Sequence, residues 1–230
     1  MNIKILAVSV LLSFSLLACG DKKNQDSYES PETSGKSSVG KSIETEDENK
    51  LKKSGEVLKE KYRDVPSAET GPVISISDTA VSAGGTAEVT VSVKGADMAW
   101  NMCGIHVTFP DELKCVRLKD DKQDVKCKKG EAVDMCDGFI ALEWIDNKPD
   151  ELINNHLGSL FFTAMFEGDS GQDGEIATFY FDVPEDAESG TVYPIGYYFM
   201  QSDMFRNLAG DASFEKYAFE NWQTGSITVK

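Results

Sequence analysis

The chain has 230 residues, of which 39 are acidic and 23 are basic, so its formal net charge is −16 at pH 7. A surface this acidic disfavours nucleic acid and anionic lipid headgroups as partners. The two histidines, His106 and His156, lie far apart, and no motif joins either of them to a Ser or Cys nucleophile. We therefore expect a protein that is not an enzyme and has no small-molecule substrate.

The first predicted element is a lipoprotein export signal over residues 1–18. A lysine precedes an apolar run at residues 5–17, which is too short to span a bilayer as a helix. Residues 16–19 read Leu-Leu-Ala-Cys, so Cys19 falls at the cleavage point, where its thiol can carry lipid. The pattern predicts a protein anchored by lipid at Cys19 to the extracellular face of the cell membrane. An ordinary secretory signal is the alternative.

The second segment, residues 19–71, consists of Cys19 and a stretch rich in Ser, Lys, Glu, Asp and Asn. Such a segment cannot bury enough apolar surface to offset the entropy lost on ordering. We expect a flexible polar linker that lets a domain reach beyond the lipid headgroups. A short helix is predicted within it around Glu48–Arg63, interrupted by Gly55, with Leu51, Val57, Leu58 and Tyr62 along one side.

The third segment, residues 72–230, is predicted to be an all-β domain. Short apolar or alternating runs are separated by turn residues, such as the pair Gly84-Gly85. This spacing is typical of a β-sandwich or barrel, and the segment is long enough for one sizeable core. The nine predicted strands are Val73–Ser77, Thr86–Val93, Ala99–Phe109, Leu113–Leu118, Phe139–Ile145, Ser159–Glu167, Glu175–Val183, Val192–Met200 and Ser226–Val229.

Apart from Cys19, the chain has an even number of cysteines, as exported proteins with disulfides do. Their number permits two disulfides with three possible pairings, and no pair has the CxxC spacing of a zinc or redox site. Free thiols buried as small apolar side chains are an equal alternative, so the pairing stays open. The four cysteines are Cys103, Cys115, Cys127 and Cys136.

The loop at residues 169–174 has some features of a calcium-binding loop, with Asp169 and Asp173 at the first and fifth positions of that motif. The third position is Gly171 and the twelfth is Tyr180, so ligands are missing, and no helices flank the loop. We therefore expect a hairpin loop and no metal site in this chain.

Four segments share the pattern of one family. They are the strand pair around the turn Gly84-Gly85-Thr86, residues 104–113, residues 174–195 and residues 225–229. Together they resemble a cohesin, the receptor module of cellulosomes that binds dockerin modules of secreted enzymes. Residues 190–195 are similar to the type III cohesins of rumen-type cellulosomes. The resemblance implies a nine-stranded jelly-roll sandwich that binds a dockerin and has no cofactor, because calcium belongs to the dockerin.

Alternation along the strands separates core side chains from outward ones. Several predicted strands carry Phe, Tyr or Met on their outward side as well, which a solvated face does not need. In cohesins the dockerin lies on the sheet that holds the third, fifth, sixth and eighth strands. On this interpretation His106 is a contact residue without a catalytic role, and the alternative is that a loop or helix such as residues 214–219 covers part of the patch. The predicted dockerin-binding residues are Met102, His106, Thr108, Phe161, Thr163, Met165, Tyr198 and Met200.

The sequence thus predicts a lipid-anchored cohesin that holds dockerin-bearing enzymes or scaffold proteins at the cell surface. A carbohydrate-binding module is one alternative, since it would use Trp100, Trp144 and Trp222 in a row on one face. Trp144 shares a strand face with Ile140 and Leu142, which we interpret as buried, and this weakens that alternative. A structural envelope lipoprotein with an immunoglobulin-like domain is the other.

Overall fold

The structure, a computed structural model, describes residues 56–119 and 123–230. The predicted signal at residues 1–18, the predicted lipidation of Cys19 and the first part of the predicted linker lie outside the described residues and remain predictions. Across the described ranges, no helix is both long and apolar enough to cross a membrane.

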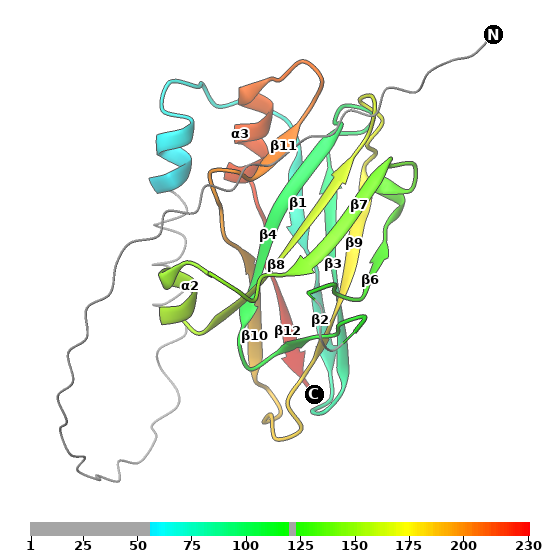
Figure 1. The fold of residues 1–230 in the computed structure, drawn as a ribbon, viewed down its shortest axis with the longest axis vertical. Helices are drawn as coiled ribbons and strands as arrows, with labels where there is room; N and C mark the ends of the chain where they lie inside the picture. Colours follow the sequence, from blue (N-terminus) through cyan, green and yellow to red (C-terminus); the bar gives the residue numbers. More distant parts are fainter. Residues whose placement is uncertain (1–55, 120–122) are drawn as a thin grey trace, which may run out of the picture. The chain divides into compact units, whose positions relative to one another are not determined.

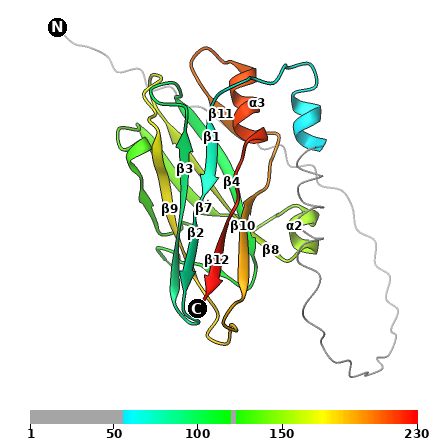
Figure 2. The ribbon, with the colours of Figure 1, turned by 180° about the vertical axis from the view of Figure 1, so that it is seen from behind.

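Two β-sheets form a sandwich, and Figure 2 turns the view so that β3 and β9 come to the front. The first sheet has five strands in the order β1-β3-β9-β5, with β6 also pairing with β9. The second has seven, in the order β2-β12-β10-β4-β8-β7, with β11 also pairing with β4 (Figure 1). The first sheet comprises β1 (Val73–Ile76), β3 (Thr86–Lys94), β5 (Lys114–Cys115), β6 (Cys127–Lys129) and β9 (Gly174–Asp182). The second comprises β2 (Asp78–Val81), β4 (Met102–Pro110), β7 (Gly138–Glu143), β8 (Leu157–Met165), β10 (Val192–Tyr197), β11 (Met204–Arg206) and β12 (Gly225–Val229).

Alternating side chains fill the space between the sheets. In β3, Ala87, Val89 and Val91 are buried, whereas Glu88, between the first two, is exposed. Phe162 of the second sheet meets Phe179 of the first, with ring centroids 5.5 Å apart. Burying one such ring contributes on the order of 1.5–3 kcal/mol, so these inward rows hold the two sheets together. The predicted fold class, an all-β jelly-roll sandwich, is confirmed.

The nine predicted strands are present, although the one predicted at Leu113–Leu118 is reduced to β5. Three further short strands, β2, β6 and β11, were not predicted. The strand predicted at Val192–Met200 ends earlier, at Tyr197, and the chain returns to the sheet only as β11. Phe199 explains the break, because its ring turns inward and packs edge-on against Phe219 at 4.8 Å.

Helices occupy three of the connections, and none of them was predicted with its bounds. They are the 3₁₀ turn η1 (Glu131–Val133), α2 (Asp150–Asn154) between β7 and β8, and α3 (Ala212–Glu220) between β11 and β12. The carboxylate of Asp211 caps α3, since it accepts hydrogen bonds from the backbone amides of Ser213 and Phe214. α3 contacts β1 and β11 at one end of the sandwich (Figure 1).

The loop at residues 169–174 is not a hairpin, so that prediction is wrong. β8 belongs to the second sheet and β9 to the first, and the loop therefore crosses between the sheets. The Asp173 carboxylate accepts hydrogen bonds from the amides of Gly95 and Ala96, at 2.9 and 2.7 Å. It thus joins two loops. In the part of the chain that the structure describes, no group of three or more His, Cys, Asp or Glu side chains could hold a metal ion.

Residues 56–71, which we expected to be flexible linker, pack on the domain instead. A helix covers residues 56–61, in agreement with the described half of the helix predicted at 48–63. Leu58 is 9% exposed and Tyr62 is 3% exposed, and both belong to the core cluster. The segment is polar in its overall composition, so the prediction overlooked these two apolar side chains. Their burial stabilises the contact of the segment with the domain.

The four cysteines of the predicted domain are free thiols in the structure, and Cys103 and Cys115 are buried. Burial raises the pKa of Cys103 to about 12, because the thiolate would lose its hydration. These two behave as small apolar core residues, which was one of the two alternatives.

Candidate protein-binding face

Four neighbouring strands, β7, β8, β4 and β11, form a continuous surface on the outward side of the second sheet. Backbone pairing places their outward residues in rows that cross the sheet at about 4.8 Å per strand. We call this surface the outer face. Its rows are Ile140, Thr163, Gly104 and Met204; Leu142, Phe161 and His106; and Gly138, Met165 and Met102.

Large apolar side chains are exposed on the outer face. Ile140 is 54% exposed and Met165 is 48% exposed, and they lie on the adjacent strands β7 and β8. Leu142, Phe161 and Met204 are half-buried beside them. A cluster of apolar side chains on a hydrogen-bonded sheet is typical of a surface that binds another protein.

Gly104 determines how closely the side chains of the outer face pack. A Cβ atom at this position would lie 3.3 Å from the ring of Phe161 and 3.5 Å from the side chain of Met204. The first distance is tighter than most carbon contacts, so the absence of a side chain lets the Phe161 ring lie across β4. A single glycine therefore joins the β8 and β11 parts of the apolar surface.

His106 and Thr108, which we predicted to be contact residues, lie below the surface, with 9% and 7% of their area exposed. The Nδ1 atom of His106 lies 2.7 Å from the Asp203 carboxylate, and its ring packs between those of Trp144 and Phe161, at 4.9 and 4.8 Å. His106 thus supports two aromatic side chains of the outer face from beneath. The His106 side chain thus contacts one carboxylate and two aromatic rings.

The carboxylate of Asp203 is fully enclosed. Burial raises its pKa, while the hydrogen bond and charge of His106 act in the opposite direction. Its second oxygen accepts a hydrogen bond from the backbone amide of Met200 at 3.2 Å. Asp203 therefore ties the loop of residues 198–203 to the underside of the outer face.

Tyr198 and Met200 are the two predicted contact residues that lie outside the paired strands. Both are half-buried in this loop. The Tyr198 hydroxyl donates a hydrogen bond to Glu151 of α2 at 3.0 Å, and burial together with Glu151 raises the pKa of Tyr198 to about 12. α2 contacts β8, and its Leu152 is fully buried. The cover over part of the sheet is thus formed by α2 and the loop, not by residues 214–219 as the alternative supposed.

Ile140, Leu142, Trp144 and Met204 belong to the outer face but are missing from the predicted set. Alternation correctly grouped the first three on one side of a strand, but we interpreted that side as buried. The structure shows the reverse, since Ala141 faces the core with 8% exposure while Ile140 points outward. Apolar residues on both sides of this strand were the available signal, because a side that only faces solvent does not need them.

The tryptophans do not form a row on one face. Trp100 is fully buried, stacked on Phe205 at 4.9 Å. Trp222 packs against Tyr197 at 4.2 Å, whereas Trp144 packs against His106 at 4.9 Å. The arrangement that a carbohydrate-binding module would need is therefore not present.

Two hollows of the described chain lie outside the outer face. One, of about 640 Å³, is lined by residues that include Lys114, Arg117 and Glu143. The other, of about 610 Å³, lies between residues 56–63 and α3 and includes Lys216 in its wall. Neither hollow is lined by any of the eight predicted contact residues.

Solved structures of cohesin modules are similar to this chain. A type III cohesin module from the cellulosomal ScaE cell-surface anchoring scaffoldin of Ruminococcus flavefaciens has 22% sequence identity and a TM-score of 0.59, covering 73% of this chain and 92% of that one. The sixth cohesin of Acetivibrio cellulolyticus scaffoldin B, solved with a mutant dockerin, has 14% identity and a TM-score of 0.50, covering 70% and 100%. A type I cohesin of Clostridium thermocellum, also solved with a dockerin, has 15% identity and a TM-score of 0.50, covering 70% and 100%.

No protein-family model and no curated protein sequence matches the chain. The likeness to the solved modules extends over both sheets, since each match covers nearly all of the module it is compared with. At these sequence identities the likeness establishes the architecture. The chain has the jelly-roll fold of a cohesin module.

Proposed function

We propose that this chain is a cohesin whose outer face binds the dockerin module of a secreted enzyme or scaffold protein, without any chemical step. The observation that carries the proposal is the adjacent pair Ile140 and Met165, about half exposed beside Phe161 on a hydrogen-bonded sheet. Two of the similar modules were solved in complex with dockerins.

A sheet face is well suited to this task because its backbone is already fixed before the partner arrives. Nine consecutive residue pairs join β4 to β8, and six join β7 to β8. Little conformational entropy is therefore lost on binding, so more of the free energy of apolar contact appears as affinity. The net charge of −16 would steer a basic or amphipathic helical partner towards the protein.

Attachment of the receptor to the cell is the second part of the proposal. Lipid on Cys19 would hold the chain at the extracellular side of the membrane, and the polar stretch that follows would set its reach. The R. flavefaciens module named above comes from a cell-surface anchoring scaffoldin, which supports this role by analogy. Metabolic labelling with a radioactive fatty acid tests it: the wild-type chain should incorporate label, and Cys19→Ser should not.

Calcium, on this proposal, belongs to the dockerin and not to the cohesin. Chelation with EDTA should therefore abolish binding while the melting temperature of the cohesin alone stays unchanged. A fall in that melting temperature on chelation would contradict the assignment.

The binding experiment is a screen of the chain against a panel of dockerins and against cellulose. Met165→Asp should abolish capture by the matching dockerin, because a carboxylate at the centre of an apolar contact would be buried without a partner. Val192→Asp is the matched control, since Val192 is also 48% exposed but lies on β10, which pairs with β12 there and not with β4. Retention on cellulose without dockerin binding would favour a carbohydrate-binding module. Binding that tolerates Met165→Asp would contradict the proposed face.

A further inference from the structure

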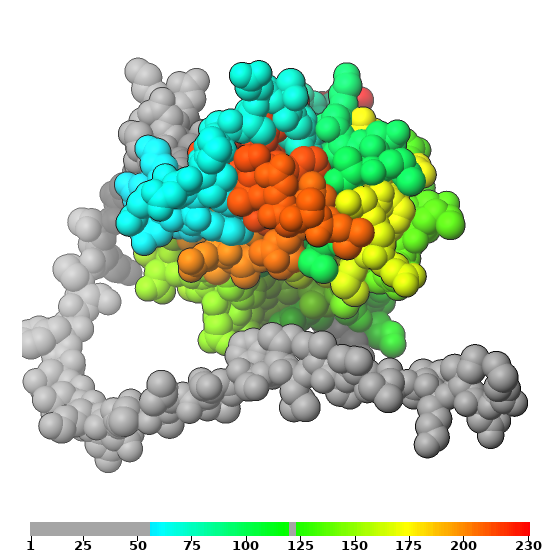
Figure 3. Space-filling view, turned by 90° about the horizontal axis from the view of Figure 1, so that it is seen from above, coloured from blue at the N-terminus to red at the C-terminus, as the bar shows by residue number. Residues whose placement is uncertain are grey.

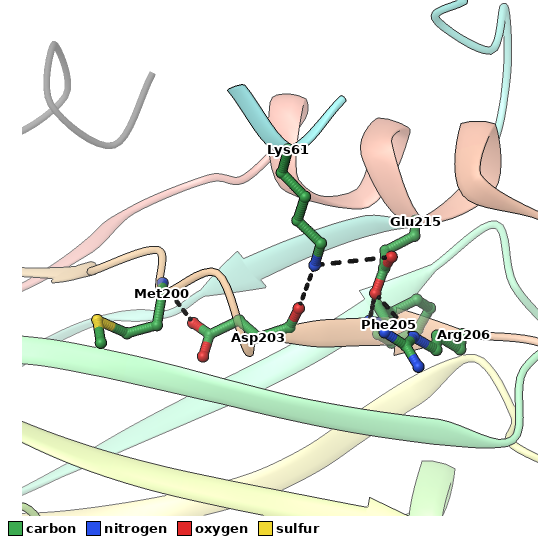
Figure 4. A network of polar contacts seen from close by, with 6 residues as sticks. All are labelled: Lys61, Met200, Asp203, Phe205, Arg206 and Glu215. Atoms are coloured by element: carbon green, nitrogen blue, oxygen red, sulfur yellow. Dashed lines mark hydrogen bonds and ion pairs between the residues drawn. The ribbon is translucent and has the colours of Figure 1, made fainter. Parts of the chain in front are cut away.

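The stretch that precedes the sandwich packs on the domain through Leu58 and Tyr62, and it also places one lysine in a polar network. Figure 3 shows residues 56–70 lying against α3 and the β11 region at one end of the sandwich. Within this stretch, Tyr62 lies 6.4 Å from the ring of Phe199 and is buried. Lys61, the residue before it, points into the domain (Figure 4).

The Lys61 amine is enclosed by groups that suit a cation. It donates a hydrogen bond to the backbone carbonyl of Asp203 at 2.6 Å, and it lies 3.7 Å from the Glu215 carboxylate. The rings of Phe199 and Tyr62 lie 5.1 and 5.2 Å from the amine. Only 15% of its side-chain surface is exposed, so burial lowers the pKa of Lys61 while Glu215 favours the charged form.

The groups that bind Lys61 belong to the loop between β10 and β11 and to the helix beside it. Asp203 ends the loop, and its side chain reaches His106 and the amide of Met200. Glu215 accepts hydrogen bonds from the backbone amide of Phe205 at 3.2 Å and from Nε of Arg206 at 3.3 Å. Lys61 therefore holds the loop at the point where the chain re-enters the second sheet (Figure 4).

The same contacts lead to the outer face. Asp203 fixes His106, and the His106 ring supports those of Trp144 and Phe161. Tyr198 and Met200, in the loop itself, are predicted contact residues at its margin. Loss of the Lys61 contact would free the Asp203 carbonyl and leave the Glu215 charge buried without its lysine, and the loop would loosen.

We propose that Lys61 is a positioning residue of the binding face: the end of the tether, residues 56–63, docks on the domain and holds the loop of residues 198–203 and His106 in the conformation that binds the partner. The inference rests on the proposed dockerin-binding function. It makes residues 56–63 a part of the receptor and not a spacer.

The first test is hydrogen exchange of the full-length chain in detergent, without any partner. Lys61→Met keeps most of the length of the side chain and removes its charge, its hydrogen bond to Asp203 and its ion pair with Glu215. We expect the Met200 and Phe205 amides to exchange at least about tenfold faster, the change expected on losing a hydrogen bond to a charged group. Arg63→Met is the matched control, because Arg63 lies two residues away with 72% of its side-chain surface exposed. Unchanged exchange in Lys61→Met would overturn the inference.

The second test is affinity for the dockerin identified with the wild-type chain. Lys61→Met should weaken binding about tenfold, and Arg63→Met should not change it. In a double-mutant cycle, Lys61→Met should be non-additive with Tyr198→Ala, which lies in the loop, and additive with Ile140→Ala, which does not. Faster exchange at Met200 with unchanged affinity, or additivity with Tyr198→Ala, would overturn the positioning role.

Failure of the underlying function would look different. If the wild-type chain binds no dockerin, the proposed function is contradicted before any variant is compared. Exchange at Met200 and Phe205 then decides alone whether Lys61 orders the loop.

Discussion

The two sheets present opposite kinds of surface to the solvent. On the first sheet, the outward side chains of β3 and β9 satisfy one another. The hydroxyl oxygens of Thr90 and Thr178 lie 3.0 Å apart, and the Thr86 hydroxyl donates a hydrogen bond to Asp182 at 2.6 Å. Such cross-strand polar pairs are complete without a partner, and they suit a face that remains in water.

On the second sheet, several outward positions carry large apolar side chains instead. Ile140 and Met165 have about half of their surface in solvent, and Phe161 lies half-buried beside them. Both sheets use the same inward alternation to build the core, so core formation does not require these residues. The difference teaches that the outward pattern, and not the inward one, carries the information about function.

The largest effect is expected from placing negative charges on the outer face. Ile140→Asp combined with Met165→Asp replaces two apolar anchors, and hot-spot side chains are worth about 2 kcal/mol or more each. We expect dockerin affinity, measured by calorimetric titration, to fall about a thousandfold. Tyr180→Asp makes the same kind of change on the outward side of β9 and should leave affinity nearly unaltered. Equal losses from both changes would erase the distinction between the faces.

A second substitution, at Glu215, which is not a residue of the outer face, tests the stability of the fold. Glu215 is 6% exposed, and Glu215→Ala leaves the Lys61 charge without its carboxylate partner and the Phe205 amide without its acceptor. Breaking a buried charge pair costs about 3–5 kcal/mol of unfolding free energy, which urea denaturation would measure. Glu220→Ala, at the exposed end of the same helix, should cost less than about 1 kcal/mol. A similar small cost for both would mean that the Lys61 contact contributes little.

A smaller effect, with a pH dependence, is expected at the start of α3. Hydrogen bonds from Ser213 hold the pKa of Asp211 below its usual value of 3.8. A lowered pKa stabilises the fold above the unfolded-state value, and this contribution is lost as pH falls through the folded-state value. Asp211→Ala should therefore cost about 1 kcal/mol at pH 7, and the difference from wild type should shrink below about pH 4. Asp211→Asn keeps a capping acceptor but does not titrate, so it should cost less than Asp211→Ala at pH 7 and show the same change with pH. A difference between wild type and Asp211→Asn that does not shrink below about pH 4 would contradict the account.

The smallest effect concerns thiol reactivity and should leave stability unaltered. Cys103 and Cys115 are buried, and burial raises the pKa of each. In the native protein at pH 8 we expect both to resist a thiol reagent until the chain unfolds, while the half-buried Cys127 and Cys136 react first. Peptide mapping by mass spectrometry identifies the modified positions. Rapid native labelling of Cys103 would show that the core of the second sheet opens.

Much of the sandwich could be predicted because a strand with one face in the core alternates. Val89, Val91 and their exposed neighbour Glu88 follow that pattern, and the observed bounds of β3 agree with it. The interruption at Tyr198 could not be predicted in the same way. It depends on the ring contact between Phe199 and Phe219 and on the hydrogen bond between Asp203 and His106. Both contacts join residues that are separated in the sequence.

The outer face shows the same limit. Alternation groups Ile140, Leu142 and Trp144 on one side of a strand, but it cannot say which side faces the core when Phe139 and Ala141 on the other side are apolar too. Only the pairing with β8 decides it. Likewise, Leu58 and Tyr62 lie in a polar segment but are buried in the core cluster, where the ring of Tyr62 lies 6.4 Å from that of Phe199, far along the chain.

The central claim is that the outer face of the second sheet is where the partner binds. Methyl NMR of the full-length chain, titrated with its dockerin, tests it most directly. We predict that the methyl signals of Ile140, Met165 and Met204 shift or broaden, while those of Ile74 in β1 and Val192 in β10 stay in place. Perturbation centred on the first sheet, or on Val192, with Ile140 and Met165 unaffected would contradict the claim.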